Sequence, residues 1–216
     1  MPDCLTSRRD RKQNRDIYAL ARGSGRRIGL LGGSFNPAHN GHRHISLLAL
    51  QHLHLDEVWW LVSPQNPLKS SDDMADFDER FAYAKTVARH PRIVVSNIES
   101  HFNTRYTLDT LRLLRRRCRR TRFVWLMGAD NLTQISKWRD WKLIFNIVPI
   151  AVFARPTYSM IALAGKAAHR YARIRMPARH AYKLATSTPP AWIFLHSRLH
   201  KASATQIRAD RNSHQD

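Results

Sequence analysis

The chain has 216 residues and a mass of 25.1 kDa, which suits one α/β domain with or without short appendages. Its 43% hydrophobic residues exclude a disordered chain, no uncharged apolar run reaches the ~20 residues of a membrane helix, and the two cysteines cannot form a disulfide scaffold. The net charge of +20 favours an anionic partner, without telling a nucleic acid from a nucleotide. No secretory signal is visible, so we expect a reduced, cytoplasmic protein.

Residues 1–26 read as a basic, disordered leader, because they combine many arginines with no apolar periodicity. Three aspartates in this segment argue against a transit peptide, since such peptides are poor in acidic residues. We expect the globular domain over residues 27–210 and a short tail over 211–216.

The first half of that domain alternates apolar runs with helical patterns. Residues 28–31 form an apolar run that predicts a buried strand, closed by a turn at Gly32 and Gly33. After it, the pattern predicts a helix over 41–55, a strand over 58–62, a loop over 65–76, a helix over 78–90 and a strand over 93–95.

The second half continues in the same way. A helix is predicted over 107–117, and strands are predicted over 123–127, 148–154 and 192–195. The strands are continuous apolar runs that alternate with helices, which is typical of a parallel sheet buried on both faces. We therefore predict a Rossmann-like, doubly wound parallel α/β sheet with helices on both faces, which binds its ligand at the carboxyl edge of the strands.

The segment that follows the first strand is the most informative, and it reads GGSFNPAHNGH over residues 32–42. Glycines let a backbone approach a nucleotide closely, and a helix beginning near Gly41 offers free N–H groups and a positive dipole end to phosphates. His39 and His42 lie at that same helix start, where both rings can donate hydrogen bonds to one anionic group. His39, His42 and His44 are alternatively metal ligands, but no Asp, Glu or Cys nearby completes a shell, so we expect phosphate rather than metal.

A second segment near the C-terminus, SATQIR over residues 203–208, has the composition of another anion site. Ser203 is a plausible N-cap, and Thr205 and Arg208 add a hydroxyl and a guanidinium at the same helix start. Serine N-caps are common, so this pattern indicates an anion site only together with the histidine segment.

These two segments together resemble the nucleotidyltransferase superfamily of HxGH enzymes, and within it the bacterial nicotinate-nucleotide adenylyltransferases. The resemblance covers residues 27–208, so the globular domain is identified as a nucleotidyltransferase domain. It implies that the histidines bind the α- and β-phosphates of ATP and that the SATQIR segment holds the β- and γ-phosphates. The cleft-lining backbone would come from Gly32, Gly33, Ser34, Phe35 and Gly41.

The interior motifs imply the remaining contacts in enzymes similar to this one. Gly128 and Asp130, in MGADN, would lie by the adenosine, with helix N-capping as the structural alternative for Asp130. Trp138 would stack on the pyridine ring, or else simply pack as an ordinary aromatic. Tyr106 and Thr107 would lie against the nicotinate carboxylate.

Two basic residues complete the resemblance. Lys69 corresponds to a loop lysine that reaches the substrate phosphates, although the family often has His where this chain has Leu68. Arg155 corresponds to an Arg-Pro step after a late strand, where the family often continues with Gly and this chain has Thr157. We assign both to the nicotinate mononucleotide site.

The resemblance implies an enzyme of NAD biosynthesis that converts ATP and nicotinate mononucleotide into nicotinate adenine dinucleotide and pyrophosphate. The mononucleotide phosphate attacks the α-phosphate of ATP in line, so catalysis needs positioning and charge stabilisation rather than a nucleophilic side chain. Mg²⁺ is expected to be held mainly by ATP oxygens.

Two alternatives remain open at this stage. The acceptor is otherwise nicotinamide mononucleotide or another phosphate, and the motifs separate nicotinate from nicotinamide poorly. A basic RNA-binding protein would explain the net charge, including the seven arginines between 112 and 122, but would leave both phosphate motifs unexplained. We regard nucleic-acid binding as the weaker reading, and the sequence leaves the oligomeric state open.

Overall fold

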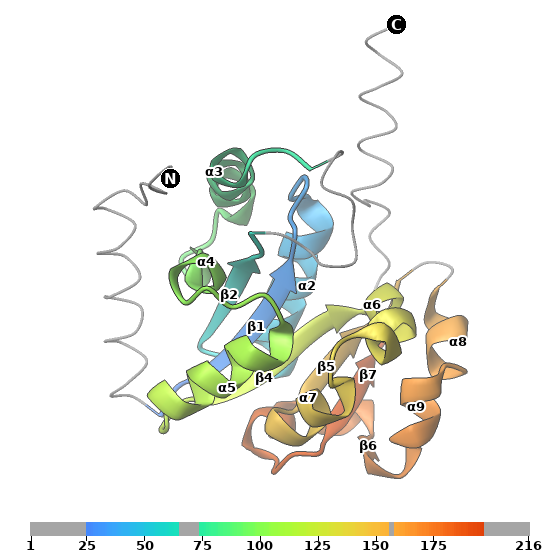
Figure 1. Cartoon of the computed structure of the whole chain (residues 1–216). Helices are drawn as coiled ribbons and strands as arrows, with labels where there is room; N and C mark the ends of the chain where they lie inside the picture. The colour runs from blue at the N-terminus through green and yellow to red at the C-terminus, as the bar shows by residue number, and fades with distance from the viewer. Residues whose placement is uncertain (1–24, 65–73, 156–157, 197–216) are drawn as a thin grey trace, which may run out of the picture.

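The computed structural model describes residues 25–64, 74–155 and 158–196. In that part of the chain, seven parallel strands form one sheet in the order β3-β2-β1-β4-β5-β7-β6. The central strands are β1 (Arg27–Gly33) and β4 (Arg122–Gly128), which pair with each other (Figure 1). The other strands are β2 (Glu57–Val62), β3 (Ile93–Ser96), β5 (Ile150–Phe153), β6 (Arg175–Met176) and β7 (Trp192–Leu195).

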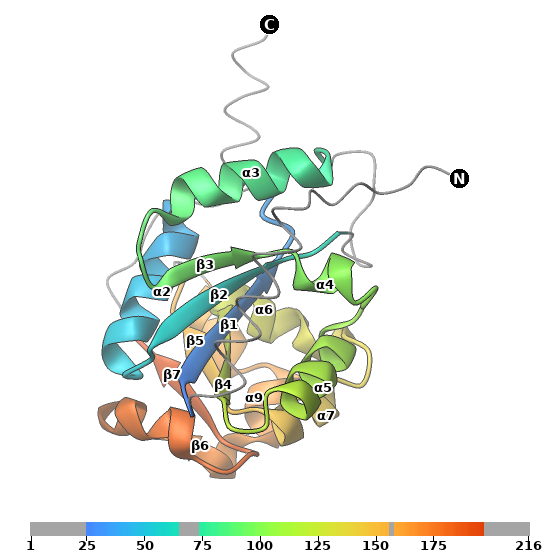
Figure 2. The same cartoon turned by 90° about the vertical axis from the view of Figure 1, so that its left-hand side faces the viewer.

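Helices cover both faces of the sheet, as Figures 1 and 2 show. One face carries α2 (Asn40–His52), α3 (Phe77–Ala88) and the 3₁₀ segment η3 (Ala178–Thr186). The opposite face carries α5 (Thr107–Arg117), α6 (Ala129–Gln134), α7 (Trp141–Ile147), α8 (Tyr158–Leu163) and α9 (Lys166–Arg170). The predicted doubly wound α/β fold is therefore confirmed. None of the described helices is both long and apolar enough to cross a membrane.

Alternation along the central strands explains why both faces are apolar. In β2, Trp59 and Leu61 belong to the core under α5, whereas Trp60 and Val62 belong to the core under α2 and α3. Each strand therefore contributes side chains to two cores, which is why the strands read as continuous apolar runs. Within the described residues the strand order reverses between β1 and β4, so the carboxyl ends of these two strands flank a topological switch point.

The predicted turn at Gly32 and Gly33 is wrong, because both glycines are the last residues of β1 and pair with Leu61 and Val62. The chain turns later, at Asn36 and Pro37. A Cβ added to Gly32 would lie 2.4 Å from Cη2 of Trp125. Position 32 is glycine because an indole ring packs close to its backbone, and not because the chain turns there.

The predicted boundaries need further corrections, most of them small. The helix predicted over 41–55 ends at His52, since Leu53 is its C-cap and His54 has a positive φ of 50°. The strand predicted over 148–154 narrows to β5, and β6 was not predicted because it is only two residues long. The short helices α4 (Ile98–His101), α6, α7, α8 and α9 were not predicted either, because four to seven residues are too few to show a helical period.

Candidate active site at the carboxyl edge of the sheet

Two histidines build the start of helix α2, directly after β1. His39 is the N-cap, and its Nδ1 accepts a hydrogen bond from the backbone N–H of Gly41 at 3.1 Å. Nδ1 of His42 accepts in turn from the backbone N–H of His39, also at 3.1 Å. The two residues thus form a capping box made of imidazoles, and their ring centroids lie 3.8 Å apart.

This capping arrangement determines where the protons lie on the two rings. A neutral imidazole has one donor nitrogen and one acceptor nitrogen, and the backbone occupies Nδ1 as the acceptor in both rings. The proton of each neutral ring must therefore reside on Nε2. A pair of adjacent Nε2–H donors is the arrangement that the predicted role in phosphate binding requires, while Gly41 uses its own N–H within the cap.

The loop between β1 and α2 is held against the same helix start. Phe35 has a positive φ of 48°, and its buried ring stacks on Trp60 with centroids 5.1 Å apart. The Trp60 indole donates to the Ser46 hydroxyl at 2.8 Å, and that hydroxyl donates to the carbonyl of His42 at 2.9 Å. The ring of Phe35, the indole of Trp60 and the hydroxyl of Ser46 therefore pack against the start of α2, where the two histidines lie.

The carboxyl end of β4 places Gly128 and Asp130 on the other side of the switch point. Gly128 is the N-cap of α6, so the alternative that Asp130 is the N-cap is wrong. The Asp130 Oδ2 atom lies 3.4 Å from the Arg155 guanidinium, which follows β5. Oδ1 is buried, and no hydrogen-bond donor within the described ranges reaches it. A Cβ at Gly128 would fall 2.4 Å from that same oxygen, so an added side chain would displace the Asp130 carboxylate from this position.

The residues predicted to contact the acceptor come from α5 and from the segment before α7. Tyr106 is the N-cap of α5 and Thr107 is its first residue. The Arg139 guanidinium lies over the Tyr106 ring, 4.6 Å from its centroid. Trp138 precedes it in the chain and meets Trp125 edge to face at 6.3 Å. Arg139, which follows Trp138 in the chain, therefore contacts Tyr106, although the two motifs are some thirty residues apart in the sequence.

Four predicted site residues lie outside the described residues, namely Lys69, Ser203, Thr205 and Arg208. The predicted leader and tail also fall outside them, except that Gly25 and Arg26 are described. Arg26 pairs with Glu57 at the start of β2, so it belongs to the folded domain.

Sequence reasoning missed two buried charged residues at this edge. Arg80, in α3, is only 3% exposed and donates hydrogen bonds to backbone carbonyls of the loops after β1 and β2. Burial lowers the pKa of its guanidinium, and the charge of Asp76 opposes that shift. A charged residue on the apolar stripe of α3, between Phe77 and Phe81, was the available signal.

Glu99 is the second, and it lies in α4 just after β3. Burial raises the pKa of its carboxyl to about 7, against the opposing effect of hydrogen bonds with Thr110 and Ser63. The Thr110 hydroxyl also reaches the Thr104 hydroxyl at 2.9 Å, so this carboxyl belongs to a network beneath the start of α5. No motif pointed to it, because a single Glu after a strand is common.

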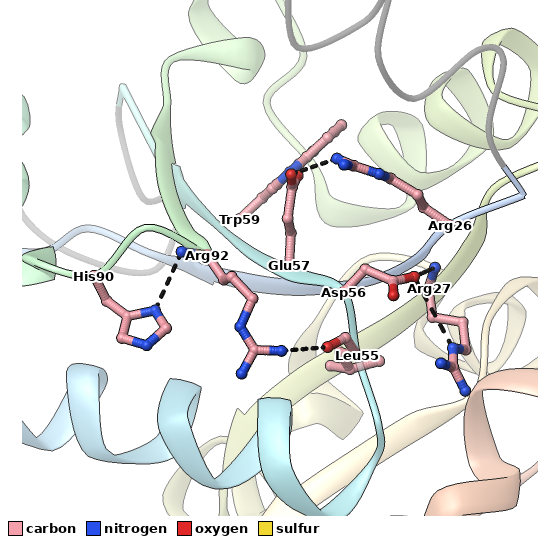
Figure 3. A network of polar contacts seen from close by, with 8 residues as sticks. All are labelled: Arg26, Arg27, Leu55, Asp56, Glu57, Trp59, His90 and Arg92. Carbon is pink, nitrogen blue, oxygen red and sulfur yellow. Dashed lines mark hydrogen bonds and ion pairs between the residues drawn. The ribbon is translucent and has the colours of Figure 1, made fainter.

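The opposite, amino edge of the sheet has a different polar network, shown in Figure 3. Arg26 pairs with Glu57 and Arg27 with Asp56, while Arg92 donates to the carbonyl of Leu55 at 3.4 Å. An open hollow at this edge is lined by Arg26, Arg27, Asp56, Glu57 and Arg92. The hollow lies at the opposite edge from the histidine pair and from Asp130 and Arg155, so we place the candidate site at the carboxyl edge.

Among the described residues, no three His, Cys, Asp or Glu side chains are grouped so that they could hold a metal ion. The polar groups that do converge at the switch point are the two imidazoles, the backbone after β1, and the Asp130–Arg155 pair. Hydrogen-bond donors combined with a helix start suit an anionic ligand such as a nucleotide phosphate.

Comparison with known proteins agrees with this geometry. Residues 30–210 match the model of the cytidylyltransferase-like family. A protein of Parvibaculum lavamentivorans named probable nicotinate-nucleotide adenylyltransferase is 52% identical over 184 residues, which cover 85% of this chain and 92% of the relative. A protein of the same name from Gluconacetobacter diazotrophicus is 51% identical over 193 residues, or 89% of this chain and 90% of the relative.

Solved structures add a likeness in fold. The nicotinic acid mononucleotide adenylyltransferase of Plasmodium falciparum, complexed with NaAD, superposes with a TM-score of 0.63 at 16% identity, covering 84% of this chain and 82% of that one. The same enzyme complexed with APC gives a TM-score of 0.61. With the family model and the close relatives, the conclusion is that this chain belongs to the cytidylyltransferase-like family and, within it, to the nicotinate-nucleotide adenylyltransferases, which are nucleotidyltransferases.

Proposed function

We propose that the protein transfers the adenylyl group of ATP to nicotinate mononucleotide, a step of NAD biosynthesis. A phosphate oxygen of the mononucleotide forms a bond to the α-phosphorus of ATP, and the bond from that phosphorus to the bridging oxygen of the β-phosphate breaks. The products are nicotinate adenine dinucleotide and pyrophosphate. The relatives' names and the family membership support this reaction.

The observation that carries the proposal is the imidazole capping box of α2. The ring centroids of the two histidines lie 3.8 Å apart, and an Nε2–H donor on each ring suits the charge that grows on the α- and β-phosphate oxygens as the bond breaks. His39 and His42 act as these donors, and neither ring becomes a nucleophile. The Nδ1 contacts with the backbone fix both tautomers before ATP arrives, so the donors need no reorganisation.

The other residues at the switch point divide between the two substrates. Backbone groups of Gly32, Gly33, Ser34 and Phe35 line the nucleotide cleft, and Asp130 offers its buried Oδ1 to a hydroxyl or amino group of adenosine, close to Gly128. ATP enters with Mg²⁺ on its phosphate oxygens as part of the substrate.

In the same proposal, nicotinate mononucleotide binds beside the start of α5. Trp138 stacks on the pyridine ring, and Tyr106 and Thr107 present the helix start to the nicotinate carboxylate. Arg155 and Lys69 contribute positive charge toward the mononucleotide. Pyrophosphate release from ATP, measured with nicotinate mononucleotide as acceptor, tests the reaction directly. Turnover that needs both substrates supports it, and the absence of acceptor-dependent turnover contradicts it.

A further inference from the structure

Arg80 makes an unusual set of contacts for a charged helix residue. Its Nε donates to the carbonyl of Ala75 at 2.8 Å, and its Nη1 donates to the carbonyls of Ser34 at 2.6 Å and of Ser63 at 2.9 Å. Its Nη2 donates to the carbonyl of Pro64 at 3.1 Å. One side chain thus holds four backbone carbonyls, and it does so with 97% of its surface buried.

These four carbonyls come from three segments that are far apart in the sequence. Ser34 follows β1, Ser63 and Pro64 follow β2, and Ala75 precedes α3. The backbone N–H of Ser63 also donates to the carbonyl of Gly33 at 2.9 Å. The guanidinium therefore ties together the exits of two neighbouring strands at the edge where the histidine pair lies. Its planar fork of donors suits such divergent acceptors, whereas an ammonium is a single point of charge.

The contact with Ser34 fixes the orientation of one peptide plane in the nucleotide loop. In a trans peptide the C=O and the following N–H point in opposite directions. When the Ser34 carbonyl points at Arg80, the N–H of Phe35 must point away from the buried side. The positive φ of Phe35, 48°, is a costly conformation for a residue with a side chain, and it needs such fixed surroundings to persist.

We propose that Arg80 is a positioning residue of the adenylyltransferase site, which orients the Ser34–Phe35 peptide so that the loop after β1 presents its backbone to ATP. This inference rests on the proposed function, because it was there that the loop was assigned to the nucleotide. Arg80 itself touches neither substrate; it acts through the carbonyls it holds.

The test uses two substitutions of Arg80 and a matched control in the full chain. Arg80→Lys keeps the charge and loses the fork, and Arg80→Ala leaves a space for an added guanidinium compound. Arg92→Lys is the control, because Arg92 also donates to a carbonyl but lies at the amino edge. For each protein we would measure the melting temperature, kcat, the KM values for ATP and nicotinate mononucleotide, and ATP affinity by calorimetry.

We expect folded Arg80→Lys to lose about 10- to 100-fold in kcat/KM for ATP, since small misplacements of binding groups have effects of this size. Arg92→Lys should stay within about twofold of the unmodified protein, as expected for an exposed side chain. Methylguanidine should restore a large part of the lost turnover to Arg80→Ala without changing the unmodified enzyme. A purely structural role would lower the melting temperature and leave kcat/KM of the folded fraction unchanged.

Wild-type kcat/KM in folded Arg80→Lys would overturn the inference. If Arg80→Ala does not fold, Arg80→Lys alone decides the matter, and if neither folds, Arg80 is a stability residue and the inference is wrong. Failure of the proposed function looks different, because the unmodified protein would then release no pyrophosphate with nicotinate mononucleotide. ATP affinity still tests Arg80 in that case: weaker binding by Arg80→Lys supports the positioning role, and equal binding refutes it.

Discussion

The two edges of the sheet have similar residue types and very different environments. At the amino edge, the Arg26 and Glu57 side chains are 35% and 18% exposed, and the pair formed by Arg27 and Asp56 is more exposed still (Figure 3). At the carboxyl edge, Arg80 and Glu99 are almost fully buried. Arginines and carboxylates at the first edge pair with each other close to water, whereas Arg80 at the second is held by backbone carbonyls and Glu99 by a threonine hydroxyl.

This difference teaches that burial, not residue type, decides whether a charged side chain is solvated by water or by the protein. An exposed ion pair contributes roughly 0–1 kcal/mol to stability, since water already solvates both partners. A buried charge is tolerated only where polar groups surround it, and a buried polar network whose hydrogen bonds are all made is rigid. The parallel topology puts the strand exits, and hence these loops, at the carboxyl edge.

The largest effect is expected from the histidine pair. His42→Ala removes one donor to the charge that develops during transfer, and kcat should fall by about 10²–10³-fold while the protein stays folded. His90→Ala is the matched control at the amino edge, where the Nδ1 atom of His90 also accepts a backbone N–H, that of Arg92. Steady-state kinetics of both variants provide the measurement. A folded His42→Ala enzyme with near-normal kcat would contradict the assignment.

Glu99 should make stability depend on pH. Its pKa is raised to about 7 in the folded protein, against the ordinary value of 4.5 in the unfolded chain, so the fold favours the protonated carboxyl. The stabilisation that results is fully present below pH 4.5 and is lost as pH rises from 4.5 through 7. The loss is about 3 kcal/mol in the free energy of unfolding.

Urea unfolding from pH 4.5 to 8 should show that loss in the unmodified protein and much less of it in Glu99→Gln, since glutamine stays neutral. Glu57→Gln, the same carboxyl-to-amide change at the amino edge, is the matched control. Identical pH profiles for the unmodified protein and Glu99→Gln would mean that Glu99 titrates normally.

Two adjacent glycines test how tightly the carboxyl edge is packed. A Cβ at position 32 would meet the Trp125 ring at 2.4 Å, whereas one at position 33 would meet the Phe35 ring at 3.5 Å, an ordinary contact. Gly32→Ala should therefore cost about 1–3 kcal/mol in unfolding free energy, and Gly33→Ala should be nearly neutral. Equal effects in chemical denaturation would show that the indole moves aside easily.

The smallest effect is expected at the amino edge. Arg26→Ala breaks the pair with Glu57 and should lower the free energy of unfolding by no more than about 1 kcal/mol, with kcat/KM unchanged. Added salt should shrink the difference further, because it screens exposed charges. A loss of activity in Arg26→Ala would show that the amino edge takes part in function after all.

The sequence was sufficient to predict the doubly wound sheet, because long apolar strands and the helices α2, α3 and α5 show their period clearly. The HxGH segment also predicted a helix start with two imidazoles, and the structure has α2 beginning at Asn40. The short helices α6 to α9 depend on tertiary packing and left no period to detect.

The misread glycines and the missed charges have a shared physical cause. Gly32 is dictated by the Trp125 ring from a strand ninety residues later, and Arg80 by carbonyls of two other loops. Both depend on contacts between distant segments, which local patterns do not carry. The roles assigned to all the site residues remain predictions, and Lys69, Ser203, Thr205 and Arg208 also lie outside the described ranges.

The most direct test of the proposed reaction is pyrophosphate release from ATP with nicotinate and nicotinamide mononucleotides measured side by side. The two acceptors differ in one group, a carboxylate or an amide, which would face the α5 start at Tyr106 and Thr107. The amide would leave a donor unpaired, at about 1–3 kcal/mol, so we expect kcat/KM to favour nicotinate by about 10- to 100-fold. Equal kcat/KM for both acceptors, or no release with the nicotinate form, would contradict the proposed site.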